Sequence, residues 1–185
     1  ESDGLTATDA TKCVACPIGW SSEAGSTKCQ SCEAGTYSNV KGEECKNCDA
    51  GQYRQSKESD GLTATDATKC VACPMGWSSE KGSTKCQSCS AGKFSNVKGE
   101  ECKNCPAGFY QKILGQASCF PCIPGKYQDL PGQSSCNKCL PNTESKNANS
   151  TKCDNCGIGQ KSEAGSAKCT RDPCRAGEFR VSSGN

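Results

Sequence analysis

Twenty of the 185 residues are cysteines, and their spacing bears more directly on chemistry than any other feature of the sequence. Nine pairs have the form C-x-x-C, and a tenth is stretched to C-x-x-x-x-C. The pairs are Cys13/Cys16, Cys29/Cys32, Cys45/Cys48, Cys70/Cys73, Cys86/Cys89, Cys102/Cys105, Cys119/Cys122, Cys136/Cys139, Cys153/Cys156 and Cys169/Cys174. Thiols paired in this way can bind zinc, cycle between dithiol and disulfide, or form structural disulfides.

Zinc is the main alternative to structural disulfides, because two C-x-x-C pairs can supply four thiolates to a tetrahedral site. However, the chain has no histidine, and twenty zinc-binding thiols would all require a reducing compartment. A redox role needs one low-pKa thiol at a helix start, which ten near-equivalent pairs in predicted loops do not offer. A cysteine content above about 8–10% is typical of secreted disulfide scaffolds. We therefore expect disulfides, with no metal and no cofactor.

The other polar residues give no support to catalysis or to nucleic-acid binding. Without histidine, a serine or cysteine nucleophile lacks its usual general base. The acidic residues Glu43, Glu44, Glu100 and Glu101 lie in two copies of one predicted surface loop, where solvation accounts for them. Lysine and arginine total 22 and aspartate and glutamate total 20, intermixed along the chain, so no basic surface is predicted. No apolar run approaches the roughly 18 residues of a membrane span, and we expect no membrane insertion within this segment.

A glycine stands three residues after the second cysteine in nine of the ten pairs. The exception is Asn142, and asparagine tolerates positive φ better than other non-glycine residues. An aromatic residue follows one or two positions later in most units, and a second glycine, or Asn149, precedes the closing cysteine. Each unit therefore reads as a turn, a short strand, a second turn and a return strand. The first-turn glycines are Gly19, Gly35, Gly51, Gly76, Gly92, Gly108, Gly125, Gly159 and Gly177, and the second-turn glycines are Gly25, Gly42, Gly82, Gly99, Gly115, Gly132 and Gly165.

Large apolar residues are too few for a conventional core, because Leu, Ile, Val and Phe together number only 18. We expect each unit to be held by one disulfide covered by one aromatic ring, with contacts mainly between neighbouring units. The predicted fold is a small, disulfide-rich, elongated linear array of about ten short disulfide-closed loop or β-hairpin units, with almost no helix.

Two disulfide patterns fit the pairs. In the sequential pattern, the second cysteine of each pair bonds the first cysteine of the next: Cys16–Cys29, Cys32–Cys45, Cys48–Cys70, Cys73–Cys86, Cys89–Cys102, Cys105–Cys119, Cys122–Cys136, Cys139–Cys153 and Cys156–Cys169. Cys13 and Cys174 are then left to bond a flanking repeat or subunit. In the interlocked pattern, neighbouring pairs bond first to third and second to fourth. We favour the sequential pattern because the glycine and the aromatic residue lie inside the loop that it closes, although sequence alone does not fix connectivity.

A longer repeat lies over the short one, because residues 1–52 recur almost unchanged as residues 58–109. The sequence therefore predicts a repeat block at 1–57, a near-identical block at 58–114, and divergent cysteine-rich units at 115–185. The residues after Cys174 resemble those after Cys48, which lead directly into the second ESDGLTATDATKC. We expect the last segment to continue into a further copy of a tandem array.

The segments CQSCEAGTYSNVKGEEC and CQSCSAGKFSNVKGEEC resemble the ephrin-receptor-like cysteine-rich repeat, which is similar to the simplest module of tumour-necrosis-factor receptors. The resemblance extends over essentially the whole chain. It implies an elongated series of small disulfide-bonded loops on an extracellular protein, and it favours the sequential pairing. The unit from Cys139 departs from the pattern because it lacks both the glycine and the aromatic residue, and the unit from Cys156 lacks the aromatic residue.

The function expected from these features is structural. The chain is predicted to be a segment of an extracellular filament, stalk or surface coat, with further copies of itself or flanking repeats as partners. The alternative is the spacer or ligand-binding ectodomain of a cell-surface receptor or adhesin. Asn149-Ser150-Thr151 is an N-glycosylation acceptor, so an N-linked glycan on Asn149 is expected.

Overall fold

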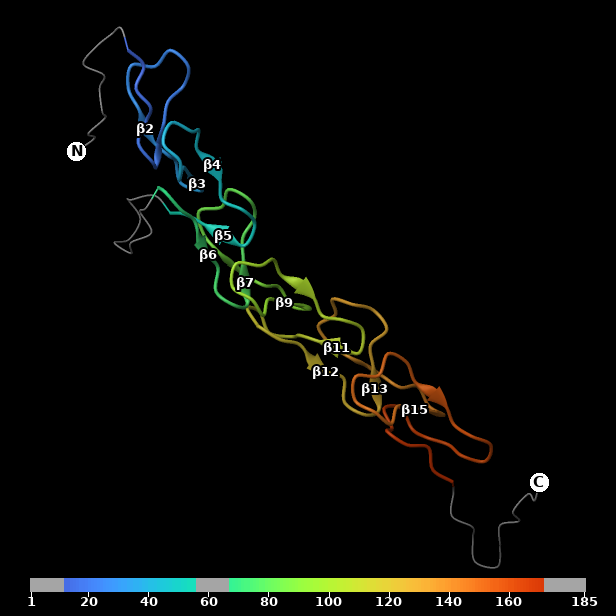
Figure 1. Cartoon of the computed structure of the whole chain (residues 1–185). Helices are drawn as coiled ribbons and strands as arrows, with labels where there is room; N and C mark the ends of the chain where they lie inside the picture. The colour runs from blue at the N-terminus through green and yellow to red at the C-terminus, as the bar shows by residue number, and fades with distance from the viewer. Residues whose placement is uncertain (1–11, 56–66, 172–185) are drawn as a thin grey trace, which may run out of the picture. The chain divides into compact units, whose positions relative to one another are not determined.

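The computed structural model describes residues 12–55 and 67–171, which contain only very short strands. No helix occurs in these two ranges, and every strand is two residues long (Figure 1). The strands that follow a first turn are β1 (Trp20–Ser21), β3 (Thr36–Tyr37), β5 (Gln52–Tyr53), β7 (Trp77–Ser78), β9 (Lys93–Phe94), β11 (Phe109–Tyr110), β13 (Lys126–Tyr127) and β15 (Thr143–Glu144). The strands inside the C-x-x-C pairs are β2 (Gln30–Ser31), β4 (Lys46–Asn47), β6 (Val71–Ala72), β8 (Gln87–Ser88), β10 (Lys103–Asn104), β12 (Phe120–Pro121), β14 (Asn137–Lys138) and β16 (Asp154–Asn155).

Consecutive strands pair to form two-stranded sheets, from β1–β2 to β15–β16. The register is constant. Trp20 lies opposite Ser31 in the first sheet, and Tyr53 lies opposite Val71 in the third. The dipeptide inside each C-x-x-C pair is therefore the return strand of the preceding hairpin. Each return strand is limited to two residues because a cysteine stands on either side of it, as Cys29 and Cys32 flank β2.

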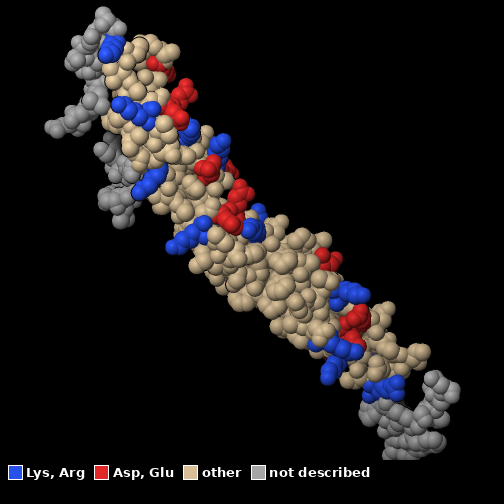
Figure 2. All heavy atoms as spheres, in the orientation of Figure 1, with Lys and Arg blue, Asp and Glu red and all other residues tan. Residues whose placement is uncertain are grey.

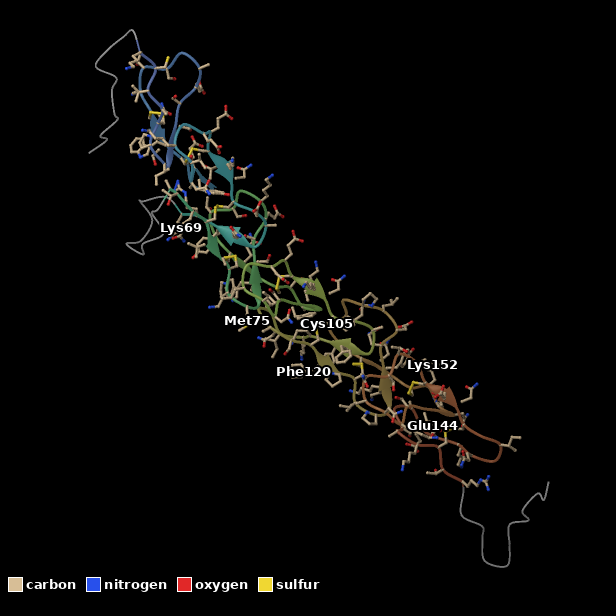
Figure 3. All side chains as sticks on the ribbon, in the orientation of Figure 1. Lys69, Met75, Cys105, Phe120, Glu144 and Lys152 are labelled. Carbon is tan, nitrogen blue, oxygen red and sulfur yellow. A yellow bond between two sulfur atoms is a disulfide. The ribbon has the colours of Figure 1, made fainter. Side chains whose placement is uncertain are left out.

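Nine disulfides close these hairpins in sequence, and Figure 3 shows their yellow S–S bonds recurring along the ribbon. Each bond joins the second cysteine of one pair to the first cysteine of the next, with Cα atoms 5.6–5.9 Å apart. We number the closed segments as loops 1 to 9: Cys16–Cys29, Cys32–Cys45, Cys48–Cys70, Cys73–Cys86, Cys89–Cys102, Cys105–Cys119, Cys122–Cys136, Cys139–Cys153 and Cys156–Cys169. The predicted fold class, a disulfide-rich array of short hairpins, is confirmed.

Both predicted turns have the expected left-handed backbone. The described first-turn glycines, from Gly19 to Gly159, have φ angles between +71° and +84°. Asn142 replaces glycine with φ 63°, and Asn149 replaces the second-turn glycine with φ 53°. These are the positive-φ non-glycine residues of the described chain. Asparagine tolerates this region because its short polar side chain can hydrogen-bond locally.

The burial pattern shows which residues form the centre of each loop, while the expectation that an aromatic ring covers each disulfide stays a prediction. Among the described aromatic residues that follow a first turn, Trp77 is 41% exposed and the others are intermediate. The buried residues include the first cysteine of each disulfide in loops 1 to 8, called the opening cysteine, with Cys48 and Cys73 at 0% exposure. They also include the first-turn glycines of loops 1 to 7 and several polar residues. Phe120, the aromatic residue that does not follow a first turn, lies in β12. Its ring centroid is 6.1 Å from that of Tyr110. The buried part of a loop therefore consists of its opening cysteine, its first-turn glycine and, in most loops, a polar side chain, while the aromatic rings are partly exposed.

The chain divides into two compact units. The first contains Glu1–Lys103 and Ile113–Ser118, and the second contains Asn104–Lys112 and Cys119–Asn185. Loops 1 to 5 lie in the first unit and loops 7 to 9 in the second. The same hairpin and disulfide arrangement recurs inside each unit.

Candidate functional site

The feature that recurs most regularly in the described chain is the joint between one loop and the next, made of backbone hydrogen bonds. In its first part, the N–H of the first-turn glycine or asparagine in one loop donates to a backbone carbonyl of the next loop. That carbonyl belongs to the residue three positions after the first turn, as in the bond from Gly19 N–H to the Ser38 carbonyl at 2.7 Å. The carbonyl of the same first-turn residue accepts a hydrogen bond from the N–H of the opening cysteine of the next loop, as in the bond from Cys32 N–H to the Gly19 carbonyl at 2.9 Å. Both contacts recur at the joints after Gly35, Gly51, Gly76, Gly108, Gly125 and Asn142, with N–O distances of 2.7–2.9 Å.

The second turn supplies the other half of the joint. Its N–H donates to the carbonyl of the opening cysteine of the preceding loop, as from Gly42 to Cys16 at 2.9 Å. The same bond is made from Gly82, Gly99, Gly115, Gly132, Asn149 and Gly165, at 2.8–3.0 Å. Because these bonds use only backbone atoms, a joint does not depend on side-chain identity except where the turn needs glycine or asparagine.

First-turn glycines also lie against the second turn of the loop after next. A Cβ atom placed on Gly35 would lie 2.1 Å from the carbonyl oxygen of Gly82, and one on Gly51 would lie 2.2 Å from that of Gly99. The same crowding, at 2.1–2.2 Å, occurs at Gly76, Gly108 and Gly125. Contacts therefore reach second neighbours as well as adjacent loops, which the sequence did not predict. Glycine is required here for space as well as for φ.

The residue three positions after the first turn, here called the central polar residue, was missed by sequence reasoning. It is polar in all nine loops, and six of the nine are 1–4% exposed. Its side chain bonds to backbone carbonyls, as from Ser95 Oγ to Val97 at 3.0 Å and from Ser79 Oγ to Gln52 at 2.7 Å. The nine residues are Ser22, Ser38, Arg54, Ser79, Ser95, Gln111, Gln128, Ser145 and Ser162. Buried polar groups are retained when they are hydrogen-bonded in this way.

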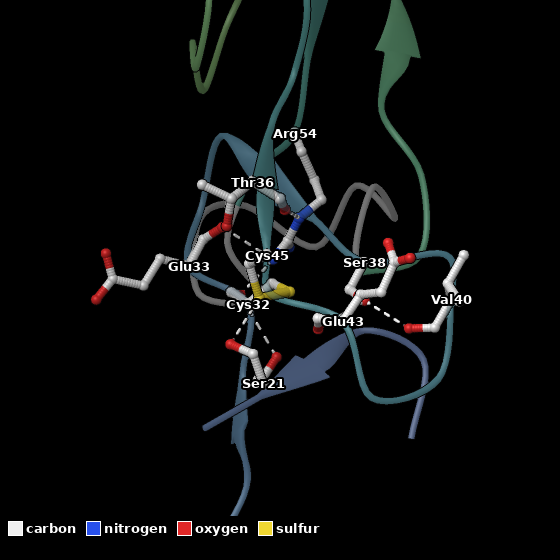
Figure 4. Close-up of a disulfide and its surroundings, with 10 residues drawn as sticks. Ser21, Cys32, Glu33, Thr36, Ser38, Val40, Glu43, Cys45 and Arg54 are labelled. Atoms are coloured by element: carbon white, nitrogen blue, oxygen red, sulfur yellow. Dashed lines mark hydrogen bonds between the residues drawn. A yellow bond between two sulfur atoms is a disulfide. The ribbon is translucent and has the colours of Figure 1, made fainter. Parts of the chain in front are cut away.

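Arg54 is the central polar residue of loop 3, and Figure 4 shows it beside the Cys32–Cys45 disulfide of loop 2. Arg54 is only 4% exposed. Its guanidinium group reaches back into loop 2, where Nε donates to the Thr36 carbonyl at 2.5 Å and Nη2 donates to the carbonyls of Cys32 and Glu33. The rigid fork of arginine donors suits several carbonyls at once. Arg54 therefore ties the long loop, with its sequence separation of 22, to the loop before it.

Replacing Arg54 with alanine should lower the free energy of opening loops 2 and 3 by about 1–3 kcal/mol, because buried carbonyls lose their donors. Arg54→Gln is the matched variant, since Gln111 occupies the same position 57 residues later and is 1% exposed. We expect Arg54→Gln to lose less than Arg54→Ala. Amide hydrogen exchange in loops 2 and 3 measures both losses. Equal exchange rates in Arg54→Ala and the parent chain would contradict this role.

Loop 8 has a carboxylate where loops 1 to 7 have an aromatic residue. Glu144 is 9% exposed, and its Oε1 accepts from Lys146 Nζ at 2.8 Å. Its Oε2 accepts from the Cys169 N–H in loop 9 at 2.6 Å. The hydrogen bond from Lys146 and then that from Cys169 hold the pKa of the Glu144 carboxyl below its ordinary value. The unit that departs from the sequence pattern thus keeps the backbone joint and adds a side-chain contact to it.

Acid should weaken the joint between loops 8 and 9. Because the folded pKa of Glu144 lies below the ordinary value of about 4.3, the carboxylate stabilises the fold above that pH, and this stabilisation is lost as the pH falls through the folded pKa. Exchange of the Cys169 amide should therefore accelerate on acidification beyond its intrinsic pH dependence. Glu144→Gln should remove this excess. An unchanged excess in Glu144→Gln would show that another group is responsible.

The predicted site cysteines fall into two groups in the structure. Eighteen lie in the nine disulfides, so their sulfur atoms are not thiolates available to a metal. Cys13 is exposed and is the free cysteine of the described residues, while Cys174 and Gly177 lie outside those residues. Asn149 is exposed on a left-handed turn, and its glycosylation stays a prediction.

The surface carries both signs of charge, and Figure 2 shows blue and red side chains along the visible face. Lys46 and Glu43 form an exposed ion pair at 2.7 Å, and Lys103 and Glu100 form its duplicate at 2.6 Å. Among residues 12–55 and 67–171, no helix is long and apolar enough to cross a membrane. In the same ranges, histidine, cysteine and acidic side chains form no cluster suited to a metal ion.

Residues 92–122 and 108–156 match the family described as tyrosine-protein kinase ephrin type A/B receptor-like. This part of the chain is similar to ephrin-receptor-like cysteine-rich repeats, and the resemblance seen in the sequence is confirmed for residues 92–156. No curated protein matches the chain. The repeats and the disulfide ladder together indicate the ectodomain of an extracellular or cell-surface protein, since disulfides persist in oxidising compartments.

Proposed function

We propose that this chain is a structural segment of an extracellular filament, stalk or surface coat. The observation that carries the proposal is the recurrence of one backbone joint from loop to loop, with each loop also closed by a disulfide. Because the joint is made by main-chain atoms and small turns, another loop can be added without redesign of the rest. Duplication of a 57-residue block fits this mode of growth.

The joint also suits a segment that must resist unfolding and proteolysis. Each disulfide limits the unfolded ensemble of its own loop, which contributes about 3 kcal/mol for a loop of roughly 15 residues. Each loop is hydrogen-bonded to its neighbours and packs against second neighbours. A protease therefore meets few backbone segments that can open alone.

The second candidate is the spacer or ligand-binding ectodomain of a cell-surface receptor or adhesin. It is favoured by the match of residues 92–122 and 108–156 to receptor-like repeats. In that case the joints would set the distance between a membrane and a binding domain elsewhere in the protein.

Immunogold electron microscopy of native material, with an antibody raised against residues 67–171, distinguishes the two. The structural proposal predicts label at regular intervals along fibres or throughout a coat. Label confined to single sites along the plasma membrane would contradict it and support the receptor alternative. Antibody preabsorbed with the folded chain is the control.

A further inference from the structure

The second turn of loop 8 contains an asparagine where the other described second turns contain glycine. Those glycines, from Gly25 to Gly165, all have positive φ, and Asn149 takes the same backbone region with φ 53°. Glycine adopts this conformation at lower cost than asparagine, so the turn by itself does not require Asn149. Asn149 is exposed, and no hydrogen bond among the described residues uses its side-chain amide. The amide is therefore accessible to chemistry that the fold does not use.

The residues that follow Asn149 suit one modification of this amide. Asn149-Ser150-Thr151 has the hydroxyl two residues after asparagine that N-glycosylation requires, and Thr151 is exposed like Asn149. Asn142, the other described asparagine at positive φ, is followed two residues later by Glu144. Asn142 is therefore a comparison within the same loop, because it shares the backbone conformation but lacks the acceptor hydroxyl.

The backbone of this acceptor segment is held by three contacts with loops 6 and 7. The Asn149 N–H donates to the Cys122 carbonyl at 2.8 Å, and the Ser150 carbonyl accepts from the Gln128 N–H at 3.0 Å. The Asn149 carbonyl oxygen lies against loop 6, 2.2 Å from where a Cβ atom on Gly108 would stand. A glycosyltransferase that draws the acceptor backbone into its own cleft must first release these contacts, which requires local opening. The folded chain therefore exposes the side chain of Asn149 but not its backbone.

We propose that Asn149 carries an N-linked glycan and that the glycan is attached before loop 8 docks on loops 6 and 7 and the Cys139–Cys153 disulfide closes. Loops 6 and 7 precede loop 8 in synthesis, so the groups that hold the acceptor backbone are already present when it emerges. Cys153 stands two residues after Thr151, so closure of the loop competes directly with glycan transfer. The exposed side chain then lets the glycosylated chain fold. This inference goes beyond the proposed function and applies equally to the receptor alternative.

The covalent step uses a lipid-linked oligosaccharide pyrophosphate as donor. Asn149 Nδ2 forms a bond to the anomeric carbon of the first sugar, and the bond from that carbon to the phosphate oxygen breaks. The lipid pyrophosphate leaves with the electron pair, and one amide proton passes to a base, so no oxidant or reductant is needed. Thr151→Ala removes the acceptor hydroxyl while it leaves Asn149 and its turn in place.

The test incubates the full 185-residue chain, produced without glycan, with purified oligosaccharyltransferase and its lipid-linked donor. Peptide mass spectrometry locates the glycan. We expect the reduced, unfolded chain to be modified at Asn149, and the folded, oxidised chain to react at least about tenfold more slowly. Neither Thr151→Ala nor Asn142 should be modified. A reduced chain without glycan, a glycan on Asn142, or a glycan on Thr151→Ala would overturn the site, and equal rates for folded and reduced chains would overturn the order of events.

Two matched double variants show which opening matters. Cys139→Ala, Cys153→Ala releases loop 8 in a chain whose other disulfides are intact, and it should raise the rate of glycosylation at least about tenfold over the folded parent. Cys32→Ala, Cys45→Ala releases loop 2, which makes none of the three contacts, so its rate should equal that of the folded parent. Equal rates in the two variants would overturn the claim that closure of loop 8 ends the time available for glycosylation.

Discussion

Replacing Gly35 with alanine should destabilise the chain far more than replacing Gly25 with alanine, although both glycines have φ +80°. Alanine in the left-handed region costs about 1–2 kcal/mol at either position. At Gly35 the new Cβ would also lie 2.1 Å from the Gly82 carbonyl oxygen, while at Gly25 nothing lies within 4 Å. Overpacking of this kind costs about a further 1–3 kcal/mol. The pair therefore separates the cost of crowding from the cost of φ.

The measurement for this pair is amide hydrogen exchange with all disulfides intact. The reporters are the Gly35 and Cys48 amides, which donate to the Arg54 and Gly35 carbonyls respectively. Gly35→Ala should accelerate their exchange at least about tenfold, and Gly25→Ala should leave them unchanged. Similar effects of the two variants would contradict the contact between loops 2 and 4.

Removal of the disulfide between Cys73 and Cys86 should open more than its own loop. The double variant Cys73→Ala, Cys86→Ala should cost about 2–5 kcal/mol. Cys73 is fully buried, its N–H donates to Gly51, and its carbonyl accepts from Gly99, so loop 4 is bonded to loops 3 and 5. We expect trypsin to cleave at Lys81 or Lys85 and hydrogen exchange to accelerate in both flanking loops.

The matched double variant is Cys156→Ala, Cys169→Ala in loop 9. Cys156 is less buried than Cys73, and a Cβ on Gly159 would meet nothing within 4 Å. The described contacts of loop 9 run back to loop 8 and to Gly125, so the change in exchange should reach loops 7 and 8. If exchange changed only inside loop 4 in the first variant, the loops would be independent and the joint would not couple them.

The turns were the part of the fold that the sequence predicted best. Positive φ is a strong local constraint that glycine meets at little cost, and Asn142 and Asn149 could be assigned to the same turns because asparagine is the usual substitute. Cysteine spacing predicted closed loops for a similar reason, since a disulfide needs its two Cα atoms within about 7 Å.

The central polar residues could not be predicted, because their burial is created by a different loop. Ser38 and Ser95 look like surface residues beside an aromatic strand until the backbone of the next loop is placed over them. The one available signal was the occurrence of serine, glutamine or arginine three residues after every first turn. The crowding at Gly35 and Gly51 was hidden likewise, since it depends on a turn 47 or 48 residues further along the chain. Such contacts follow from three-dimensional packing and leave no short-range pattern.

Disulfide mapping of the non-reduced protein tests the central claim, that closed loops follow one another in sequence. Lys46 separates Cys45 from Cys48, so trypsin can place these two neighbouring cysteines in different peptides. The structure predicts one cross-linked species that joins Cys32 to Cys45 and another that joins Cys48 to Cys70. A species that joins Cys45 to Cys70, as the interlocked pattern requires, would contradict it.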